Sequence, residues 1–411
     1  MSSTGNTSNH FDALDGWRGL CACLVALFHF HGNSPLYAWD LIRNSYLFVD
    51  FFFVLSGFVI AWNYGARLAN WPAVRQFLVL RVGRLYPLHI FMLALFVAWE
   101  AAKLVSGWFS PPGPQAFVGE NRLDTILSNV LLVQSLHLND GLSWNAPSWS
   151  ISTELWAYIV FALVSVTFGL RHWMLALVAL AAPLFLLAVT TTGMDVTYDW
   201  GLVRCLFGFA LGVACARLYR RRIDRPARGA GSATLLECVA LAAVVWFVSR
   251  AGRSDWSLLA PFVFAAAVLV FADERGWFSR LLQRPLFKWL GMLSYSIYLT
   301  HYLVVVLLPV FVKRVLHLDL WTPVALPNGQ TVELFGRSVL EGTLLFALVL
   351  VLTLAFSACT YRWIETPGRE WSRSLARRLA ARNASATAAP GRVPAPLSRA
   401  TDRSSTRIAP P

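Results

Sequence analysis

The sequence has 411 residues, of which 57% are hydrophobic and only 14% are charged, and its mean hydropathy is +0.54. This composition excludes an ordinary soluble protein. The net charge of +13 is not accompanied by a basic stripe interleaved with aromatic residues on a soluble module, so a nucleic-acid partner is not expected. We predict an all-α integral membrane protein.

Apolar segments long enough to cross a bilayer, about 17 to 25 residues each, recur along nearly the whole chain. The predicted spans are residues 14–31, 46–64, 85–106, 150–168, 173–191, 201–219, 234–250, 257–273, 290–312 and 338–361. A shorter apolar stretch, residues 126–136, is too brief to span and is expected to form a re-entrant or interfacial helix. The prediction is a polytopic bundle of about ten transmembrane helices.

The basic residues predict the orientation, because Lys and Arg are held back on the cytoplasmic side during insertion. They concentrate in the loops after even-numbered spans and in the C-terminal segment, so both termini are predicted to be cytoplasmic. We expect a cytoplasmic segment (1–12), a transmembrane domain (13–367) and a basic disordered tail (368–411), whose Ala, Arg, Ser and Pro cannot bury enough apolar surface to fold alone. The protein would be multi-pass in the cytoplasmic (inner) membrane.

The first span carries charged or titratable residues at both ends. Arg18 and His29 are eleven positions apart, which on a helix is three turns plus about 20°, so their side chains share one face about 16 Å apart. Asp15, three residues before Arg18, is placed for an ion pair or to orient a neighbour. Each residue alone has a simple structural explanation. Arg18 could extend to the lipid headgroups, and His29 could be a hydrogen-bonded residue of the core. Their shared face predicts instead that both look into one cavity.

The second span contains Asp50 near its outer end and the pair Ser56-Gly57 at its middle. An intramembrane carboxylate is costly unless it is paired, so Asp50 is expected to be functional or to pair with a neighbour such as His29. A glycine beside a serine is typical of a site where another helix approaches closely. Packing is therefore the simpler interpretation of Ser56-Gly57.

Arg81 and Arg84 lie at the inner entrance of the third span. They obey the positive-inside rule, and they would equally suit a polyanion from the cytosol because guanidinium binds phosphate bidentately. The fourth span begins with a serine-rich segment that includes Ser152 and is followed by Glu154. Glu154, near the outer surface, could orient His29 or hold an acceptor hydroxyl, or it could simply complement the helix dipole.

Polar residues return in the last two predicted spans. Tyr298 and His301 lie in the ninth, while Tyr361 and Glu365 close the tenth. Short groups of polar residues thus interrupt the apolar spans at six places, and we call them polar islands. Six of them in one polytopic chain are hard to explain by packing alone.

Together these islands resemble the membrane-bound acyltransferase-3 family, whose hallmark is an Arg or Lys followed after ten residues by His in the first span. Arg18 and His29 meet that spacing. The resemblance continues through LDGWRG, FVDFFFVLSGF, RVGRLYP, WSISTELWAY, SYSIYLTH and YRWIETP, and covers residues 14–367. It implies transfer of an acyl group, with acetyl expected, from acyl-coenzyme A to a hydroxyl of a sugar-containing acceptor: a surface polysaccharide, a glycolipid or a secondary metabolite.

The resemblance also implies roles for the residues. Arg18, Arg81 and Arg84 would bind the phosphates of acyl-coenzyme A. His29 would be the general base, or the site of a covalent acyl intermediate, and the carboxylates expected to support it are Glu154, Asp50 and Asp15. His301 could be a second proton-relay or binding group. Further candidate site residues are Ser56, Ser152, Tyr298, Tyr361 and Glu365. No metal or permanently bound cofactor is expected.

Two other classes of function remain open from the sequence. A transporter or flippase of a lipid or polysaccharide precursor would also have many spans with buried charges, although no internal repeat is visible and the Arg-to-His spacing favours the enzyme. A non-catalytic sensor or scaffold is the third interpretation. The acceptor is expected at the outer loop 107–147, which contains Trp108 and Trp144, because aromatic faces stack on sugars; the same residues could instead form an interfacial aromatic belt.

Overall fold

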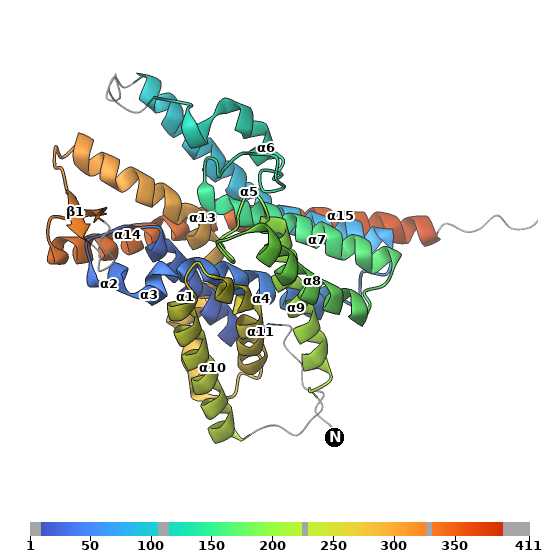
Figure 1. Cartoon of the computed structure of the whole chain (residues 1–411). Coiled ribbons are helices and arrows are strands. Elements are labelled where there is room, and N and C mark those ends of the chain that lie inside the picture. Colours follow the sequence, from blue (N-terminus) through green and yellow to red (C-terminus); the bar gives the residue numbers. More distant parts are fainter. Residues whose placement is uncertain (1–9, 106–114, 224–228, 326–330, 389–411) are drawn as a thin grey trace, which may run out of the picture.

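The computed structural model describes residues 10–105, 115–223, 229–325 and 331–388 (Figure 1). Helices form almost all of the regular structure. The longer helices are α1 (Asp12–Phe28), α4 (Phe48–Tyr64), α5 (Trp71–Val105), α7 (Trp149–Thr167), α8 (His172–Val189), α9 (Gly201–Arg220), α10 (Ala230–Ala251), α11 (Ala260–Phe271), α13 (Pro285–Arg314), α14 (Val339–Thr360) and α15 (Thr366–Ala388). The short ones are α2 (Pro35–Ala38), α3 (Asp40–Arg43), α6 (Ile126–Val130), α12 (Trp277–Leu282), several 3₁₀ turns and the π-helical segment η6 (Tyr361–Glu365).

Each of the ten predicted spans coincides with a helix. Within the described ranges, eight helices are long and apolar enough to cross a membrane by length and composition. The other two predicted spans fall on α1, with 17 residues, and on α11, with 12 residues preceded by a 3₁₀ turn. The chain is therefore a helical, multi-pass membrane protein, while the count of ten crossings and the cytoplasmic termini stay predictions.

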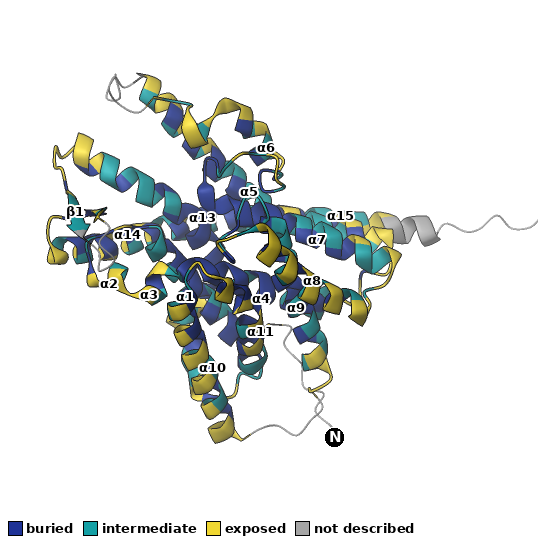
Figure 2. Ribbon diagram, viewed as in Figure 1, coloured by how far each residue is buried: buried dark blue, intermediate teal, exposed yellow. Residues whose placement is uncertain are grey.

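The outer helices expose apolar side chains rather than polar ones. On α8, Leu180 and Leu184 are 65% and 66% exposed, and on α10, Leu235 and Trp246 are similarly exposed. Figure 2 shows buried residues gathered where the central helices meet and exposed residues along α8 and α10. A helix that is apolar on its exposed side is typical of contact with lipid, because such a surface is unfavourable in water.

Glycines bring the central helices into backbone contact. A Cβ on Gly212 of α9 would lie only 1.9 Å from the Val54 carbonyl oxygen of α4, and one on Gly57 only 2.1 Å from the Phe209 oxygen. Any larger residue would force α4 and α9 apart. The interpretation of Gly57 as a close-packing residue is confirmed.

A second glycine contact joins α1 to α13. A Cβ on Gly19 would lie 2.5 Å from the Leu290 carbonyl carbon, and one on Gly291 would lie 2.3 Å from the Asp15 oxygen. This close approach places the N-terminal half of α1 directly against α13. It therefore determines which side chains of α13 face Arg18.

Two segments depart from the predicted all-α bundle. Strands β1 (Trp321–Ala325) and β2 (Thr331–Phe335) form an antiparallel pair in which Trp321 lies opposite Phe335. Phe335 donates its N–H to the His31 oxygen at 2.8 Å, so this pair is attached to the chain just after α1. The stretch 126–136 forms only the five-residue α6 followed by turns, which is less helix than predicted.

The predicted disorder of the tail is wrong for residues 368–388, where α15 is helical. Its side chains supply the missing burial by docking on α5: Ser372 is 1% and Ala376 2% exposed, and a Cβ on Gly83 of α5 would collide with the Ser372 side chain. Ala, Arg and Leu are also strong helix formers. Residues 389–411 lie outside the described part of the chain.

Candidate active site

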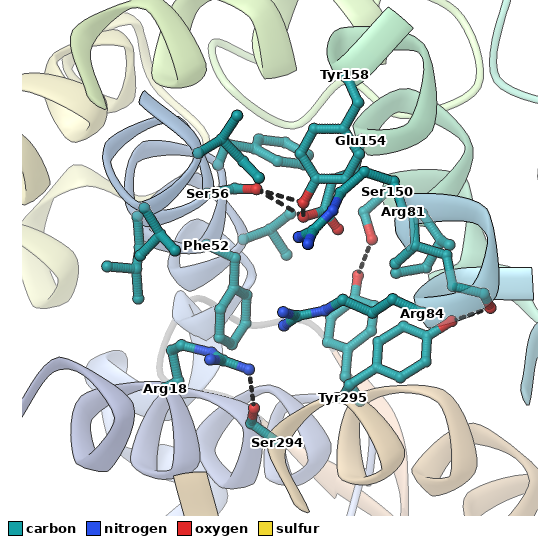
Figure 3. A pocket seen from close by; sticks show the side chains of 18 residues that line it. Arg18, Phe52, Ser56, Arg81, Arg84, Ser150, Glu154, Tyr158, Ser294 and Tyr295 are labelled. Carbon is teal, nitrogen blue, oxygen red and sulfur yellow. Dashed lines mark hydrogen bonds between the residues drawn. The ribbon is translucent and has the colours of Figure 1, made fainter. Parts of the chain in front are cut away.

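A cavity of about 740 Å³ lies between α1, α4, α5, α7 and α13 (Figure 3). The apolar part of its wall includes Phe52, Phe53, Ile60 and Leu85. Its polar lining side chains are Arg18, Ser56, Arg81, Arg84, Ser150, Glu154, Tyr158, Ser294, Tyr295 and Tyr298. We call this space the inner cavity.

A wider space, which we call the vestibule, adjoins the inner cavity. It measures about 1420 Å³ and shares Arg18, Arg81 and Arg84 with the inner cavity, so the two are continuous. Six basic side chains line the vestibule, against only Asp12 and Asp15 as acids. The basic ones are Arg18, Arg67, Arg81, Arg84, Lys288 and Arg369. An excess of positive charge in a concave site attracts and concentrates anions.

Arg18 is held at the junction of the two spaces. It donates to Asp15 Oδ1 at 2.6 Å and to Ser294 Oγ at 2.9 Å. His10, at the rim of the vestibule, lies 2.9 Å from the other oxygen of Asp15. This hydrogen bond to the Asp15 carboxylate raises the pKa of His10 and so favours one more positive charge at the entrance.

Arg84 is a basic side chain that lines both the inner cavity and the vestibule. Among the described residues it forms no hydrogen bond and no ion pair, and Figure 3 shows its guanidinium directed into the cavity towards Arg18 and Phe52. Arg81 donates to the Tyr64 hydroxyl at 3.3 Å and packs against three aromatic rings, but its buried Nε has no partner. Two guanidinium groups with unused donors face one space, which is the chemistry of a phosphate site.

Glu154 is engaged inside this cavity. Its Oε1 accepts hydrogen bonds from Ser56 Oγ, at 2.7 Å, and from the Tyr158 hydroxyl. The prediction that Glu154 orients His29 is wrong, because α7 directs this carboxylate to α4 and towards the arginines of α5.

His29 lies at the other end of α1, one residue past the last helical position. Its Nδ1 is 2.9 Å from the Val25 carbonyl oxygen and 3.2 Å from Nε2 of His301 on α13. The residues that line the inner cavity and the vestibule include Arg18 but not His29, so these two residues do not share that space as predicted.

One aromatic side chain connects the inner cavity to the histidine pair. Tyr298 lines the cavity, accepts a hydrogen bond from Ser150 at 2.8 Å, and packs edge-on against His301 at 5.9 Å between ring centroids. Phe52, also in the cavity wall, lies 5.9 Å from the Tyr298 ring. The Tyr298 ring therefore separates the end of the inner cavity from the imidazoles of His301 and His29.

Asp50 does not pair with His29. Its carboxylate accepts two hydrogen bonds from Arg204 of α9, at 2.9 and 2.7 Å, and the two side chains are 0% and 1% exposed. Arg204 also donates to the backbone oxygens of Tyr46 and Val196. The predicted catalytic role of Asp50 is replaced by a structural one, because both carboxylate oxygens and four of the five guanidinium N–H groups are used within the bundle.

Removal of Asp50 is accordingly expected to destabilise the fold. Asp50→Ala should cost about 3–5 kcal/mol of unfolding free energy, because Arg204 would be left buried without its counter-charge. The melting temperature in detergent measures this loss, and the double variant Asp50→Leu with Arg204→Met should recover much of it. An Asp50→Asn protein that melts like the wild type but is inactive would contradict the structural assignment.

The remaining predicted residues lie around the site. Ser152 donates to the Leu132 oxygen at 2.7 Å and anchors the turn after α6, outside the cavity. Glu365, in η6, accepts from Ser296 at 2.7 Å and forms an ion pair with Arg369 of the vestibule. The Arg369 guanidinium in turn lies 5.8 Å from the ring centre of Tyr361.

Trp144 of the loop 107–147 does not form the predicted sugar platform. Trp144 is 2% exposed and donates its indole N–H to Thr125 at 2.9 Å, so it holds the loop together and presents no face to a ligand. Trp108 lies outside the described residues.

Four residues of the site region escaped the sequence interpretation. Arg204 had a readable signal, because an arginine inside a predicted span requires a carboxylate, and Asp50 was available. Arg369 lay in the segment predicted to be disordered. Tyr158 and Ser294 stand in the motifs WSISTELWAY and SYSIYLTH, but neither was singled out as a site residue, since a tyrosine or a serine in a span is ordinary.

The comparison with known proteins decides the family. The family model for the acyltransferase-3 acyltransferase domain matches residues 11–362, nearly the whole chain. The chain belongs to this family. The membership predicted from the sequence motifs is thus confirmed, and the protein is a membrane acyltransferase.

Three relatives of the acyltransferase illustrate the match. It is 34% identical over 191 residues to protein 2 of the picA locus of Rhizobium radiobacter, covering 43% of this chain and 94% of that one. It is 27% identical over 297 residues (70% and 71%) to BcsY of Komagataeibacter xylinus, named a membrane-bound transacylase. It is 29% identical over 283 residues (62% and 67%) to the acyltransferase MdmB of Streptomyces mycarofaciens. No solved structure matches the chain significantly.

Proposed function

We propose that this acyltransferase moves an acetyl group from acetyl-coenzyme A to a hydroxyl of a sugar-containing acceptor, in the cytoplasmic membrane, with His29 as general base. The observation that carries the proposal is the pair of continuous cavities lined by six basic side chains, with Arg84 directed into the space without a direct partner. The relatives named as a transacylase and an acyltransferase agree with the reaction class.

The donor would enter through the vestibule. Coenzyme A carries several phosphate charges, and Arg18, Arg81 and Arg84 surround the passage into the inner cavity. Guanidinium groups bind phosphates through paired, charge-assisted hydrogen bonds. The vestibule lies at the ends of α1, α4 and α5 that the basic loops assign to the cytosol, which is where acyl-coenzyme A is made available.

The thioester arm would then occupy the inner cavity. Its narrow, uncharged pantetheine chain suits a wall that combines apolar side chains with hydroxyls such as Ser56 and Ser150. The cavity points at Tyr298, and this ring must turn aside for the thioester carbonyl to meet His29.

At His29 the acceptor oxygen would attack the thioester carbonyl carbon. The hydroxyl proton passes to the imidazole, the carbon–sulfur bond breaks, and the proton is returned to the coenzyme A thiolate. The products are an ester and free coenzyme A. His29 is only partly buried, so an acceptor can approach it from the outer end of α1. A positioned histidine base accelerates such a step by about 10²- to 10⁴-fold.

Reconstitution tests the proposal directly. The protein in lipid nanodiscs, given acetyl-coenzyme A with a labelled acetyl group and a lipid and glycan extract from parent cells lacking the gene, should place label in alkali-labile esters. Heat-treated protein and nanodiscs without protein are the controls. Calorimetry should show saturable binding of coenzyme A. If neither binding nor label transfer occurs, while a labelled lipid moves across proteoliposomes, the flippase alternative holds instead.

A further inference from the structure

The outer end of the site contains two imidazoles in contact. His29 follows the last turn of α1, His301 lies in the middle of α13, and their ring centroids are 4.9 Å apart. His301 is fully buried, whereas His29 is partly accessible. The atoms that meet are Nε2 of His301 and Nδ1 of His29, at 3.2 Å.

The surrounding carbonyl groups determine which nitrogen carries each proton. Nδ1 of His301 is 3.1 Å from the Ile297 oxygen, and Nδ1 of His29 is 2.9 Å from the Val25 oxygen. A carbonyl oxygen can only accept a hydrogen bond, so both Nδ1 atoms must be protonated. With both rings neutral, Nε2 of His301 is a bare acceptor, and the single Nδ1–H of His29 is shared between this nitrogen and the Val25 oxygen. Nε2 of His29 is then free to take a proton.

We propose that His301 is the positioning residue of the base: it accepts the Nδ1–H of His29, leaves Nε2 of His29 as the proton acceptor, and stabilises the imidazolium formed during transfer. This inference rests on the proposed function. It assigns to a neutral imidazole the part that a carboxylate plays in a catalytic triad.

The other acids near the site are already engaged, which explains why a histidine fills this place. Among the described residues, the hydrogen-bond partners of His29 include no carboxylate. Asp50 is bound by Arg204, Glu154 by Ser56 and Tyr158, and Glu365 by Ser296 and Arg369. A neutral partner also avoids placing an additional uncompensated charge inside the membrane when the enzyme is idle.

The test compares three variants in the nanodisc assay. His301→Leu should lower kcat by about 10- to 100-fold, as expected when the partner that orients a functional histidine is lost, and should leave KM for acetyl-coenzyme A unchanged. His301→Gln, whose amide oxygen can accept where Nε2 did, should restore most of the rate. Thr300→Val is the matched control, because Thr300 is equally buried but bonds to Ser296 and Ser357 instead.

A wild-type kcat in His301→Leu would overturn the inference. It would also be overturned if His301→Gln were as slow as His301→Leu while both variants had the melting temperature of Thr300→Val. Histidine-¹⁵N NMR of the full-length protein gives a second, activity-independent readout. The His29 signal, identified by its loss in His29→Gln, should show a protonated Nδ1 and a bare Nε2. A bare Nδ1 on His29 would refute the role assigned to His301, whether or not the wild-type protein transfers acetyl groups. A wild-type protein that transfers no acetyl group would reject only the proposed function.

Discussion

His29→Ala is expected to lower acetyl transfer by about 10²- to 10⁴-fold while coenzyme A binding stays at the wild-type level. The two effects separate because His29 does not line the cavity in which the donor would bind. Removing the imidazole takes away the proton acceptor but leaves Arg18, Arg81 and Arg84 in place. The measurements are label transfer from acetyl-coenzyme A and calorimetric binding of coenzyme A to the same preparation.

His31→Ala is the matched control for this variant. His31 is only two residues away but exposed, and its ring packs near Tyr37 rather than against His301. This variant should keep the wild-type rate. Equal losses in both variants would indicate damage to the outer end of α1, and a fully active His29→Ala protein would remove the histidine from the mechanism.

The same preparation distinguishes a general base from a covalent carrier. When labelled acetyl-coenzyme A is mixed with wild-type protein without acceptor and quenched, a base leaves the protein unlabelled. An acyl-histidine intermediate would leave label on the wild type that His29→Ala lacks.

The second large effect is expected at Arg84. Arg84→Gln should weaken coenzyme A binding by about 10- to 100-fold, because a hydrogen bond to a charged group contributes about 1.5–3 kcal/mol. Its guanidinium faces the cavity without a hydrogen-bond or ion-pair partner among the described residues, so its loss removes ligand contacts and breaks no direct pair of the folded protein. Calorimetry with coenzyme A measures the change, and kcat at saturating donor should change far less than KM.

Arg75→Gln is the control for Arg84, since Arg75 lies on the same helix but is exposed and outside both cavities. It should bind coenzyme A like the wild type. Arg84→Lys keeps the charge without the paired donors and should fall between the two. If Arg84→Gln binds as tightly as Arg75→Gln, the phosphates do not lie where the cavity places them.

Glu154 illustrates how a residue can lie in the cavity wall and yet have been given the wrong neighbour. Its polarity inside a span marked it as functional, and it does line the inner cavity. The partner was wrong because the sequence periodicity of α7 specifies a face of one helix, not which helix lies opposite. The same reasoning applies to Asp50, whose partner Arg204 is 154 positions away.

The tail shows a different limit. Its composition argued against independent folding, and that argument concerns the segment in isolation. In the chain, α15 follows η6 and α14 directly and docks on α5 at Gly83. Contacts with α5 supply the burial that the segment lacks in isolation, and such tertiary packing is the main source of helix stability in folded proteins.

The sequence by itself determined the membrane class, the positions of the ten apolar helices and the resemblance to the family, because bilayer thickness imposes long apolar runs and short motifs recur in a set order along them. Only the tertiary structure decided that Arg18, Arg81 and Arg84 line one cavity. It also decided that Asp50 forms its ion pair with Arg204 and that His29 contacts His301. Those pairings depend on how closely and at what rotation separate helices pack, which glycines such as Gly19 and Gly291 permit but which no single helix encodes.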